Sequence, residues 1–172
     1  AKSIIQKAID LNNNSSENYL NLATILVKEK QLEDAELYTR KAIHLNPTFV
    51  EAFSNLGGIL FEIGNFKEAE LSARKAITLK PEFAEAHLNL GNILFQQDKI
   101  KEAYFHTKKA LEIDTNFAEA YFLSAKCLNE FQTIEDAEKA IKKAIEINPK
   151  LTYAYCLLAN ILKEKGELFQ AQ

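Results

Sequence analysis

The sequence has few of the residues that interrupt regular structure, with only 5 glycines and 3 prolines among 172 residues. An all-β fold that turns about every ten residues needs more of both, so that class is excluded. The net charge of −3 lacks the basic excess typical of general nucleic-acid-binding proteins. No apolar run approaches the roughly 18 residues that a membrane-spanning helix needs. We therefore expect neither nucleic acid nor a membrane as a partner.

Residues that carry chemistry are also scarce. Cys127 and Cys156 both fall inside helical patterns, without the spacing of a zinc site or the density of a disulfide scaffold. We predict that both are free, reduced and mainly packing residues. The three histidines occupy unrelated places without a ligand partner at metal-site spacing, and no phosphate-binding loop or nucleophile motif is present. The sequence predicts no catalytic residue, no metal site and no cofactor, and hence no enzyme.

What the sequence does contain is a repeat of 34 residues. Pro47 and Pro81 are 34 residues apart, and Pro149 lies at twice that distance beyond Pro81. In this frame four full repeats follow one another without insertion or deletion, at 16–49, 50–83, 84–117 and 118–151. Residues 1–15 match the end of an earlier repeat and residues 152–172 the beginning of a later one. We therefore expect a single array over 1–172 that is a fragment of a longer one.

Each repeat has the pattern of two helices. In the second full repeat, Phe53, Leu56, Gly57 and Leu60 form an amphipathic stripe at three- and four-residue spacing. A break follows, and the next helix ends where Pro81 cannot continue it. The breaks are expected at glycine or polar residues, namely Gly64, Asp98 and Gly166. Two residue pairs are predicted to cap second helices, Asn65 with Glu68 and Thr133 with Asp136.

Small residues recur at fixed places of the repeat, where they let two helices approach closely. They are Gly57, Gly91, Ala23, Ala125 and Ala159 in the first helices, and Ala35, Ala69, Ala103, Ala137, Ala42, Ala76, Ala110 and Ala144 in the second. A single hairpin cannot bury its apolar stripe alone, so neighbouring hairpins must stack. The predicted fold is an all-α solenoid of antiparallel helix hairpins.

This pattern resembles the tetratricopeptide repeat family. The family's aromatic, Leu-Gly, large apolar, Ala, Ala and Pro places are matched by Phe53, Leu56, Gly57, Leu60, Ala69, Ala76 and Pro81. His87, Ser124, Asn13 and Thr115 depart from it. The resemblance covers the whole chain. It implies a right-handed superhelix whose first helices line a concave groove that binds peptides or protein segments.

Carboxamides dominate the face opposite the apolar stripe of the first helices. The sixth residue of successive repeats is Asn21, Asn55 and Asn89, and Asn92 stands at the ninth place of its repeat. Each carboxamide offers a donor and an acceptor to an extended backbone. The row is similar to the asparagine ladder in the helical arm of O-linked N-acetylglucosamine transferases, although Leu123 and Leu157 end it. The alternative interpretation is that Asn is a common solvent-facing residue at this place.

The same predicted groove holds acidic and apolar residues. Glu51 and Glu85 belong to a row with Glu17 and Glu119, which would favour a basic ligand; alternatively, acids in the first turn complement the helix dipole. The apolar candidates for contact with a ligand are Leu20, Phe61, Leu88, Phe95 and Phe122. They could instead pack against neighbouring repeats.

The basic residues argue against two other ligand classes. Lys126 is the only basic residue at the second, sixth and ninth places, so recognition of an acidic chain terminus, as in chaperone adaptors, is not expected. The second helices carry four basic pairs, Arg40-Lys41, Arg74-Lys75, Lys108-Lys109 and Lys142-Lys143. Acids four residues earlier, at Glu36, Glu70 and Glu138, are placed to neutralise them, which favours a solvated face over an anion-binding surface.

The sequence thus predicts a non-catalytic scaffold, expected in the cytoplasm, that binds an extended peptide or protein segment, basic segments included. Two alternatives remain, the substrate-presenting arm of a larger transferase and a purely architectural spacer. The partial repeats at the two ends predict one more contact. Ile4, Ile5, Ala8 and Ile9 would seek the stripe of Tyr155, Leu158, Ala159 and Leu162 on a second copy, which gives head-to-tail association.

Overall fold

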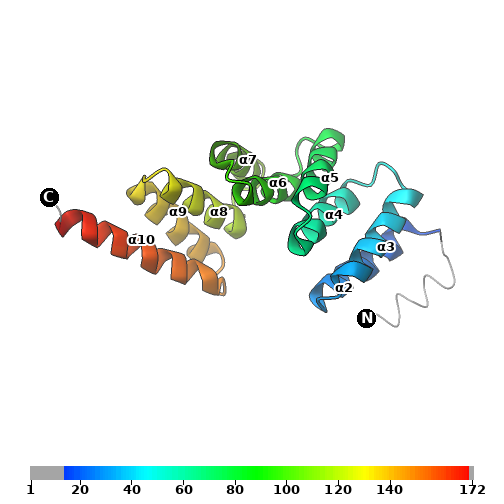
Figure 1. Ribbon diagram of the computed structural model, residues 1–172, viewed down its shortest axis with the longest axis horizontal. Helices are drawn as coiled ribbons and strands as arrows, with labels where there is room; N and C mark the ends of the chain where they lie inside the picture. Colours follow the sequence, from blue (N-terminus) through cyan, green and yellow to red (C-terminus); the bar gives the residue numbers. More distant parts are fainter. Residues whose placement is uncertain (1–13, 171–172) are drawn as a thin grey trace. The chain divides into compact units, whose positions relative to one another are not determined.

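The computed structural model describes residues 14–170, with side-chain environments up to residue 166, and this part of the chain is entirely helical apart from turns (Figure 1). Its nine helices are α2 (Ser16–Lys28), α3 (Leu32–Leu45), α4 (Val50–Ile63), α5 (Phe66–Leu79), α6 (Ala84–Gln96), α7 (Ile100–Ile113), α8 (Ala118–Glu130), α9 (Ile134–Ile147) and α10 (Thr152–Gln170). The predicted helix of residues 1–15 falls almost wholly outside the described residues.

The helices pack as sequential hairpins, which confirms the all-α solenoid prediction. In Figure 1, α2 lies against α3 and α4 against α5, and α8 lies against α9, which in turn contacts α10. The chain separates into two compact units, 1–90 and 91–172, and the boundary falls inside α6. Each unit is described below by itself, and the expectation of one continuous array over 1–172 stays a prediction.

The turn inside each hairpin depends on one residue with a left-handed backbone. The residue at the fifteenth place of each full repeat has a positive φ: Lys30 (59°), Gly64 (93°), Asp98 (62°) and Gln132 (59°). Only glycine adopts this region without strain, since a Cβ crowds the following carbonyl. The repeat frame therefore fixes where each first helix ends, even where the residue is not glycine.

The connection between repeats uses a side-chain turn before the proline place. Asn46 Oδ1 accepts hydrogen bonds from the backbone N–H and hydroxyl of Thr48, at 3.1 and 2.9 Å. Asp114 and Asn148 accept from the backbone two residues on in the same way, at 2.8 and 3.2 Å. These Asx turns hold the chain after α3, α7 and α9, and backbone hydrogen bonds from Phe49 to Asn46 and from Leu151 to Asn148 support two of them. Their recurrence explains the constant connection length.

The small residues bring the helices of a hairpin together as predicted. A Cβ added to Gly57 would lie 3.3 Å from the Ala69 carbonyl oxygen and 3.5 Å from the Ala73 Cβ. In the second unit, a Cβ on Gly91 would lie 3.3 Å from the Ala103 carbonyl oxygen. Around these contacts the aliphatic cores are close-packed. In the first unit Leu22 and Leu26 are each 1% exposed, and a fully buried leucine side chain contributes about 1.5–3 kcal/mol to folding.

Two local predictions are wrong and one is confirmed. Asn65 caps α5 by accepting a hydrogen bond from the Glu68 N–H at 3.4 Å, as predicted. Thr133 makes no capping bond, because its hydroxyl donates to the Leu128 carbonyl at 2.9 Å instead. The break predicted at Gly166 is also absent, since α10 continues from Thr152 to Gln170. The cost of a left-handed turn at Gly166 would be offset only if a second helix packed against α10. Six residues follow Gly166 in this sequence, and a helix that short is not stable by itself.

Candidate functional site

The carboxamide row, defined as Asn21, Asn55 and Asn89, lies on three first helices of the first unit. α2 contacts α4, and Asn89 on α6 reaches back to α4. Asn21 is exposed, whereas Asn55 and Asn89 are half-buried. The side chains of Asn21 and Asn55 make no hydrogen bond to another described residue, so both carboxamides retain their full donor and acceptor capacity. A face with two such groups is suited to binding a peptide backbone.

Asn89 is held in place by the preceding repeat. Its Nδ2 donates to the Ser54 carbonyl oxygen and to the Ser54 hydroxyl, both at 3.1 Å. A Cβ on Gly58 would lie 3.9 Å from the same nitrogen, so Gly58 leaves room for this contact. Because the amide hydrogens are engaged, Asn89 presents mainly its oxygen as an acceptor. Sequence reasoning assigned it both roles.

The acidic row occupies the helix starts. Glu17, Glu51, Glu85 and Glu119 each lie in the first turn of their helix. Glu51 and Glu85 are exposed. Carboxylates in the first turn are stabilised by the free N–H groups and the helix dipole. This position supports the alternative interpretation of the row, and its contact with a basic ligand stays a prediction.

The apolar candidates in the first unit are less accessible than a binding role needs. Leu20 is 8% exposed and packs with Ala42 and Ala52, and Leu88 is 7% exposed. The alternative that apolar residues pack against neighbouring repeats describes these two leucines. Phe61 is half-buried, with its ring centroid 5.7 Å from that of Phe66 on the next helix. Of the three, Phe61 retains the most surface for a ligand.

In the second unit, Phe95, Phe122, Lys126 and Tyr153 form what we call the aromatic–lysine cluster. Lys126 Nζ lies 4.0 Å from the Phe95 ring centroid and 5.9 Å from that of Phe122. The Phe122 and Tyr153 rings meet edge to face, with centroids 4.6 Å apart. The residues come from α6, α8 and α10, at the twelfth, fifth, ninth and second places of their repeats. Asn92, also predicted to bind, is half-buried on α6.

Burial shifts the pKa of two members of this cluster. The pKa of Lys126 lies below its ordinary value because burial lowers it more than the neighbouring Cys127 and Glu130 raise it. Burial also raises the pKa of the Tyr153 hydroxyl, and the negative charge of Glu119 raises it further. The cluster is therefore a partly desolvated site, in which burial opposes the positive charge of Lys126 while Glu130 and the ring faces favour it.

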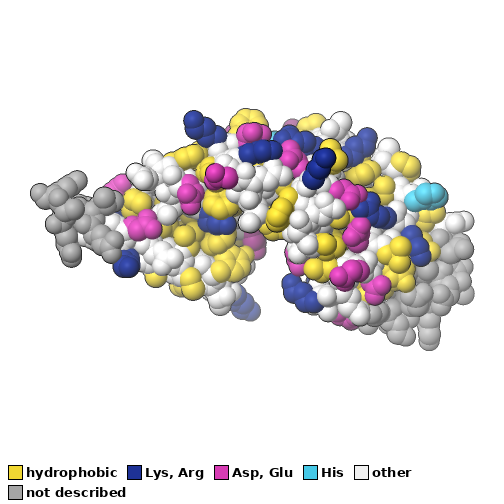
Figure 2. Space-filling view, in the orientation of Figure 1, with side chains coloured by type: hydrophobic (Ala, Val, Ile, Leu, Met, Phe, Trp, Pro, Cys, Tyr) yellow, Lys and Arg dark blue, Asp and Glu magenta, His cyan; other side chains and the backbone are white. Residues whose placement is uncertain are grey.

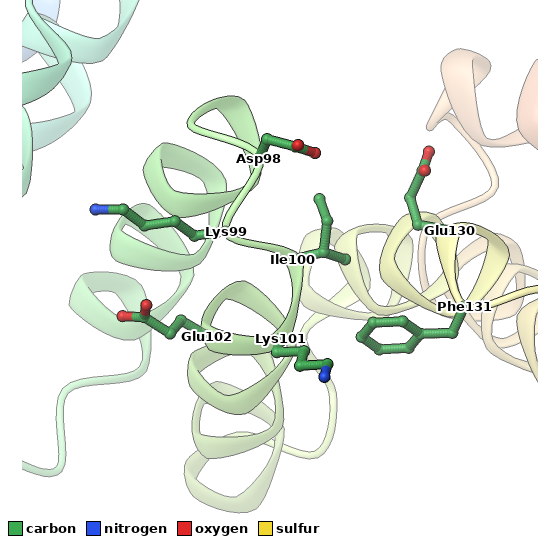
Figure 3. Close-up of a pocket in the computed structure, with 7 residues that line it drawn as sticks. All are labelled: Asp98, Lys99, Ile100, Lys101, Glu102, Glu130 and Phe131. Carbon is green, nitrogen blue, oxygen red and sulfur yellow. The ribbon is translucent and has the colours of Figure 1, made fainter.

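Two cavities among the described residues lie away from every predicted site residue. One, of about 440 Å³, lies between the α6–α7 turn and the end of α8, and is lined by Asp98, Lys99, Ile100, Lys101, Glu102, Glu130 and Phe131. Figure 3 shows Ile100 and Phe131 lying between the charged side chains of the rim. The Phe131 ring packs edge to face on Tyr104 at 5.6 Å. Its lining mixes both charge signs and favours no particular ligand.

The second cavity, of about 390 Å³, lies in the first unit between α3 and α5. Its floor includes Phe53 and Leu56, and Leu71 at its edge is 64% exposed. Arg40 closes one side through an ion pair to Glu68 at 2.5 Å. The lining also includes His44, Ser72 and Lys75, so it mixes apolar, basic and acidic side chains and favours no particular ligand.

The basic rows of the second helices are neutralised as predicted. Arg40 pairs with Glu36 at 2.8 Å, Arg74 with Glu70 at 2.8 Å, and Lys142 with Glu138 at 2.5 Å. Figure 2 shows basic and acidic side chains interspersed on the face that it draws. Exposed pairs of this kind contribute little to stability and leave no concentrated positive field for a polyanion.

The cysteines differ from each other more than the sequence suggested. Both are free, and Cys127 is buried, where desolvation raises its thiol pKa to about 12. Cys156 is exposed on α10, so the prediction that it is a packing residue is wrong. Its place in the repeat holds Leu20, Ser54, Leu88 and Phe122 elsewhere, but no later helix covers Cys156 among the described residues. In the described part of the chain, no cluster of His, Cys, Asp and Glu is arranged to hold a metal ion. No described helix combines the length and apolarity needed to cross a bilayer.

Comparison with known families decides the assignment. Two tetratricopeptide repeat models match residues 20–82 and 140–172, which together exceed half of the chain. The chain is a tetratricopeptide repeat protein. A further model, of subunit 3 of the anaphase-promoting complex or cyclosome, matches residues 62–144. No curated protein matches the sequence significantly.

Solved structures of other tetratricopeptide proteins share the fold. YrrB, described as having an unusual peptide-binding site, is 25% identical with a TM-score of 0.71, and the match covers 96% of this chain and 86% of that one. A protein from Thermus thermophilus is 18% identical with a TM-score of 0.81, covering 94% and 88%. Pseudomonas aeruginosa PilF is 22% identical with a TM-score of 0.78, covering 94% and 75%. Tetratricopeptide proteins are generally non-catalytic scaffolds for protein–protein interaction.

Sequence reasoning missed the aromatic–lysine cluster of this tetratricopeptide protein. It named Phe95 and Phe122 separately and treated Lys126 only as an isolated charge. The available signal was a change of residue type at two places of the repeat. At the ninth place Lys126 stands where other repeats have Thr24, Gly58, Asn92 and Asn160. At the second place Tyr153 stands where other repeats have Glu. Two such changes on neighbouring first helices, beside two phenylalanines, indicate a local site.

Proposed function

We propose that this protein captures an extended polypeptide segment on the face formed by its first helices, through hydrogen bonds from Asn21, Asn55 and Asn89. The observation that supports this most is the state of the carboxamide row. Two of its members have unused donors and acceptors, and the third is oriented by Ser54. An extended chain advances about 3.3 Å per residue and packed helices are about 8–10 Å apart, so one Asn serves about every third residue.

The remaining predicted residues would contact the ligand within their own units. Phe61 in the first unit, and Phe95 and Phe122 in the second, offer half-buried aromatic surface, and Asn92 adds a fourth carboxamide. Leu20 and Leu88 would support the face from beneath, because they are nearly buried. Glu51 and Glu85 would favour a segment with positive charge. The neighbour YrrB, with its peptide-binding site, is consistent with this class of ligand.

The test is to select binders from an array of extended peptides and to measure their affinity for two variants. Asn21→Ala/Asn55→Ala removes both uncommitted carboxamides and should weaken binding by about 0.5–1.5 kcal/mol per lost hydrogen bond. Asn116→Ala, an exposed Asn in a turn, is the matched control and should leave affinity unchanged. Equal affinities of the double variant and the wild type for every selected peptide would exclude the carboxamide row as the binding element. Absence of any binder would favour the spacer interpretation.

We also propose the head-to-tail contact on α10. Tyr155 and Leu162 are 47% and 46% exposed, and they occupy the stripe that α5 covers on α4. Figure 2 shows hydrophobic side chains gathered where Figure 1 draws the first half of α10. The proposed partner, the helix of residues 1–15 in a second copy, lies outside the described residues. Multi-angle light scattering should show concentration-dependent association that Leu162→Glu abolishes, and a strict monomer at high concentration would contradict it.

A further inference from the structure

Lys126 is the unusual member of the aromatic–lysine cluster. Several basic residues of the second helices form ion pairs, for example Lys109 with Glu112 at 2.6 Å and Lys143 with Glu146 at 2.9 Å. Lys126 is half-buried and makes no ion pair with a described residue. Its ammonium group instead lies 4.0 Å from the centre of the Phe95 ring. A positive charge is thus held mainly by aromatic faces.

We propose that Phe95, Phe122 and Tyr153 form a binding site for an ammonium or guanidinium group of the ligand, and that Lys126 occupies this site in the free protein. The inference rests on the proposed function, because it assigns the chemistry of one side chain of the captured segment. The proposed cation site lies in the second unit and is separate from the carboxamide row of the first unit. It also makes Lys126 a competitor of the ligand.

The surroundings of the cluster favour a cation over an anion. Ring faces carry the negative part of the aromatic quadrupole, and they attract cations within about 6 Å of the centroid. Glu119 is close enough to act on Tyr153, and Glu130 is close enough to act on Lys126. A carboxylate of a ligand would meet the carboxylates of Glu119 and Glu130 and the ammonium group of Lys126. An ammonium group of a ligand would meet only the two carboxylates once Lys126 has left the site. Tyr153 is 47% exposed, so the site is open to a ligand.

Lys126 is held in a way that permits release. Its flexible four-carbon chain makes no hydrogen bond to a described residue, so only contacts with the rings oppose its movement into water. The apparent affinity of a ligand for such a site is its intrinsic affinity reduced by the fraction of molecules in which the site is empty. A cation–π contact of ordinary strength implies a reduction of about five- to thirtyfold.

The experiment compares two short fluorescein-labelled peptides that differ only in carrying lysine or glutamate, measured by fluorescence anisotropy at fixed ionic strength. Lys126→Ala should bind the lysine peptide about five- to thirtyfold more tightly than the wild type. Adding Phe95→Leu, which keeps apolar volume but removes the ring, should abolish this gain. Lys108→Ala is the matched control, since it removes one positive charge from an exposed residue of α7 in the same unit.

Four outcomes would overturn the inference. Equal tightening by Lys126→Ala and Lys108→Ala would show an effect of net charge alone. Weaker binding of the glutamate peptide by Lys126→Ala would show that Lys126 binds anions. Failure of Lys126→Ala to bind either peptide would exclude the cation site. A peptide that Asn21→Ala/Asn55→Ala loses but Lys126→Ala binds unchanged would support the proposed function and still exclude this site.

A second measurement does not depend on affinity. Lys126 Nζ lies 4.0 Å from the Phe95 ring centroid, so we expect ring currents to shift the NMR signals of the adjacent methylene protons upfield. Phe95→Leu should remove that shift in a folded protein, as judged by circular dichroism. Saturation of the wild type with the lysine peptide should return the signals to the values of an exposed lysine. Signals that stay shifted in the complex would show that Lys126 is not displaced.

Discussion

At the scale of single residues, the neighbouring glycines Gly57 and Gly58 of α4 differ in whether the surrounding structure has room for a side chain. Gly57 faces the second helix of its hairpin, where a Cβ would lie 3.3 Å from the Ala69 carbonyl oxygen. Gly58 faces Asn89 of the carboxamide row, where the first contact of a Cβ is Asn89 Nδ2 at 3.9 Å. Both glycines lower helix propensity equally. Only the first is needed for close packing.

We therefore expect the two alanine variants to differ in sign. Gly58→Ala should stabilise the protein by up to about 1 kcal/mol, because alanine is the better helix former and the site has room. Gly57→Ala should lose stability, since the Ala69 backbone must shift to admit the Cβ and such overpacking costs about 1–3 kcal/mol. Thermal unfolding followed by circular dichroism measures both, and a higher melting temperature for Gly57→Ala would contradict the packing argument.

At the scale of elements, each hairpin depends on the left-handed turn at its fifteenth place and on contacts between successive helices. Three of the four described turns place a non-glycine residue there. Gly64 differs because its φ of 93° lies beyond the region that other residues tolerate. No atom lies within 4 Å of an added Cβ at Gly64, so backbone strain alone decides the effect of a substitution.

Gly64→Ala should therefore destabilise the protein by about 1–2 kcal/mol, the cost of a left-handed non-glycine residue. Gln132→Gly is the reciprocal control. Glycine relieves the backbone strain at the φ of 59° but adds conformational entropy to the unfolded chain, and because the two effects offset each other, stability should stay close to that of the wild type. The denaturant midpoint is the measurement. A midpoint for Gly64→Ala equal to that of the wild type would show that the turn relaxes freely.

The α9–α10 contact predicts an acid dependence of stability. Glu138 is 14% exposed and pairs with Lys142 at 2.5 Å and Lys165 at 2.7 Å. These two lysines lower the pKa of Glu138 from 4.5 to about 2. Because the pKa is lowered on folding, the stabilisation is present above about pH 4.5 and is lost as the pH falls toward 2.

Glu138→Gln should accordingly show a smaller fall in melting temperature than the wild type between pH 6 and pH 2. It should also be less stable than the wild type near neutral pH. Melting curves recorded across this range test both points. Parallel curves for the two proteins would show that Glu138 does not take part in the acid transition.

At the scale of the whole molecule, stability should be local, because the described helices of each unit contact only helices next to them, or one further along, in the sequence. In such arrays stability is close to a sum of repeat and nearest-neighbour terms. Leu26 is 1% exposed and packs with Leu22, Ala35 and Ile59 within the first unit.

Leu26→Ala, which should cost about 2–5 kcal/mol, is expected to lower amide protection mainly in α2 to α5. Hydrogen exchange read by mass spectrometry should show α8 and α9 changed far less. Equal loss of protection in all helices would mean that the chain unfolds as one cooperative body, and the nearest-neighbour description would then be wrong.

The sequence by itself determined the fold, the repeat frame and the residues available on each face, because a 34-residue period with small residues at fixed places admits only stacked hairpins. It also determined the ion pairs within the second helices, such as Arg40 with Glu36 and Lys142 with Glu138, since these depend on helical spacing alone. The tertiary structure decided which available side chains are committed. Asn89 is engaged by Ser54, Leu20 and Leu88 are buried, and Lys126 lies on the Phe95 ring. These contacts join different repeats, so they depend on how neighbouring helices pack, which a pattern within one helix does not specify.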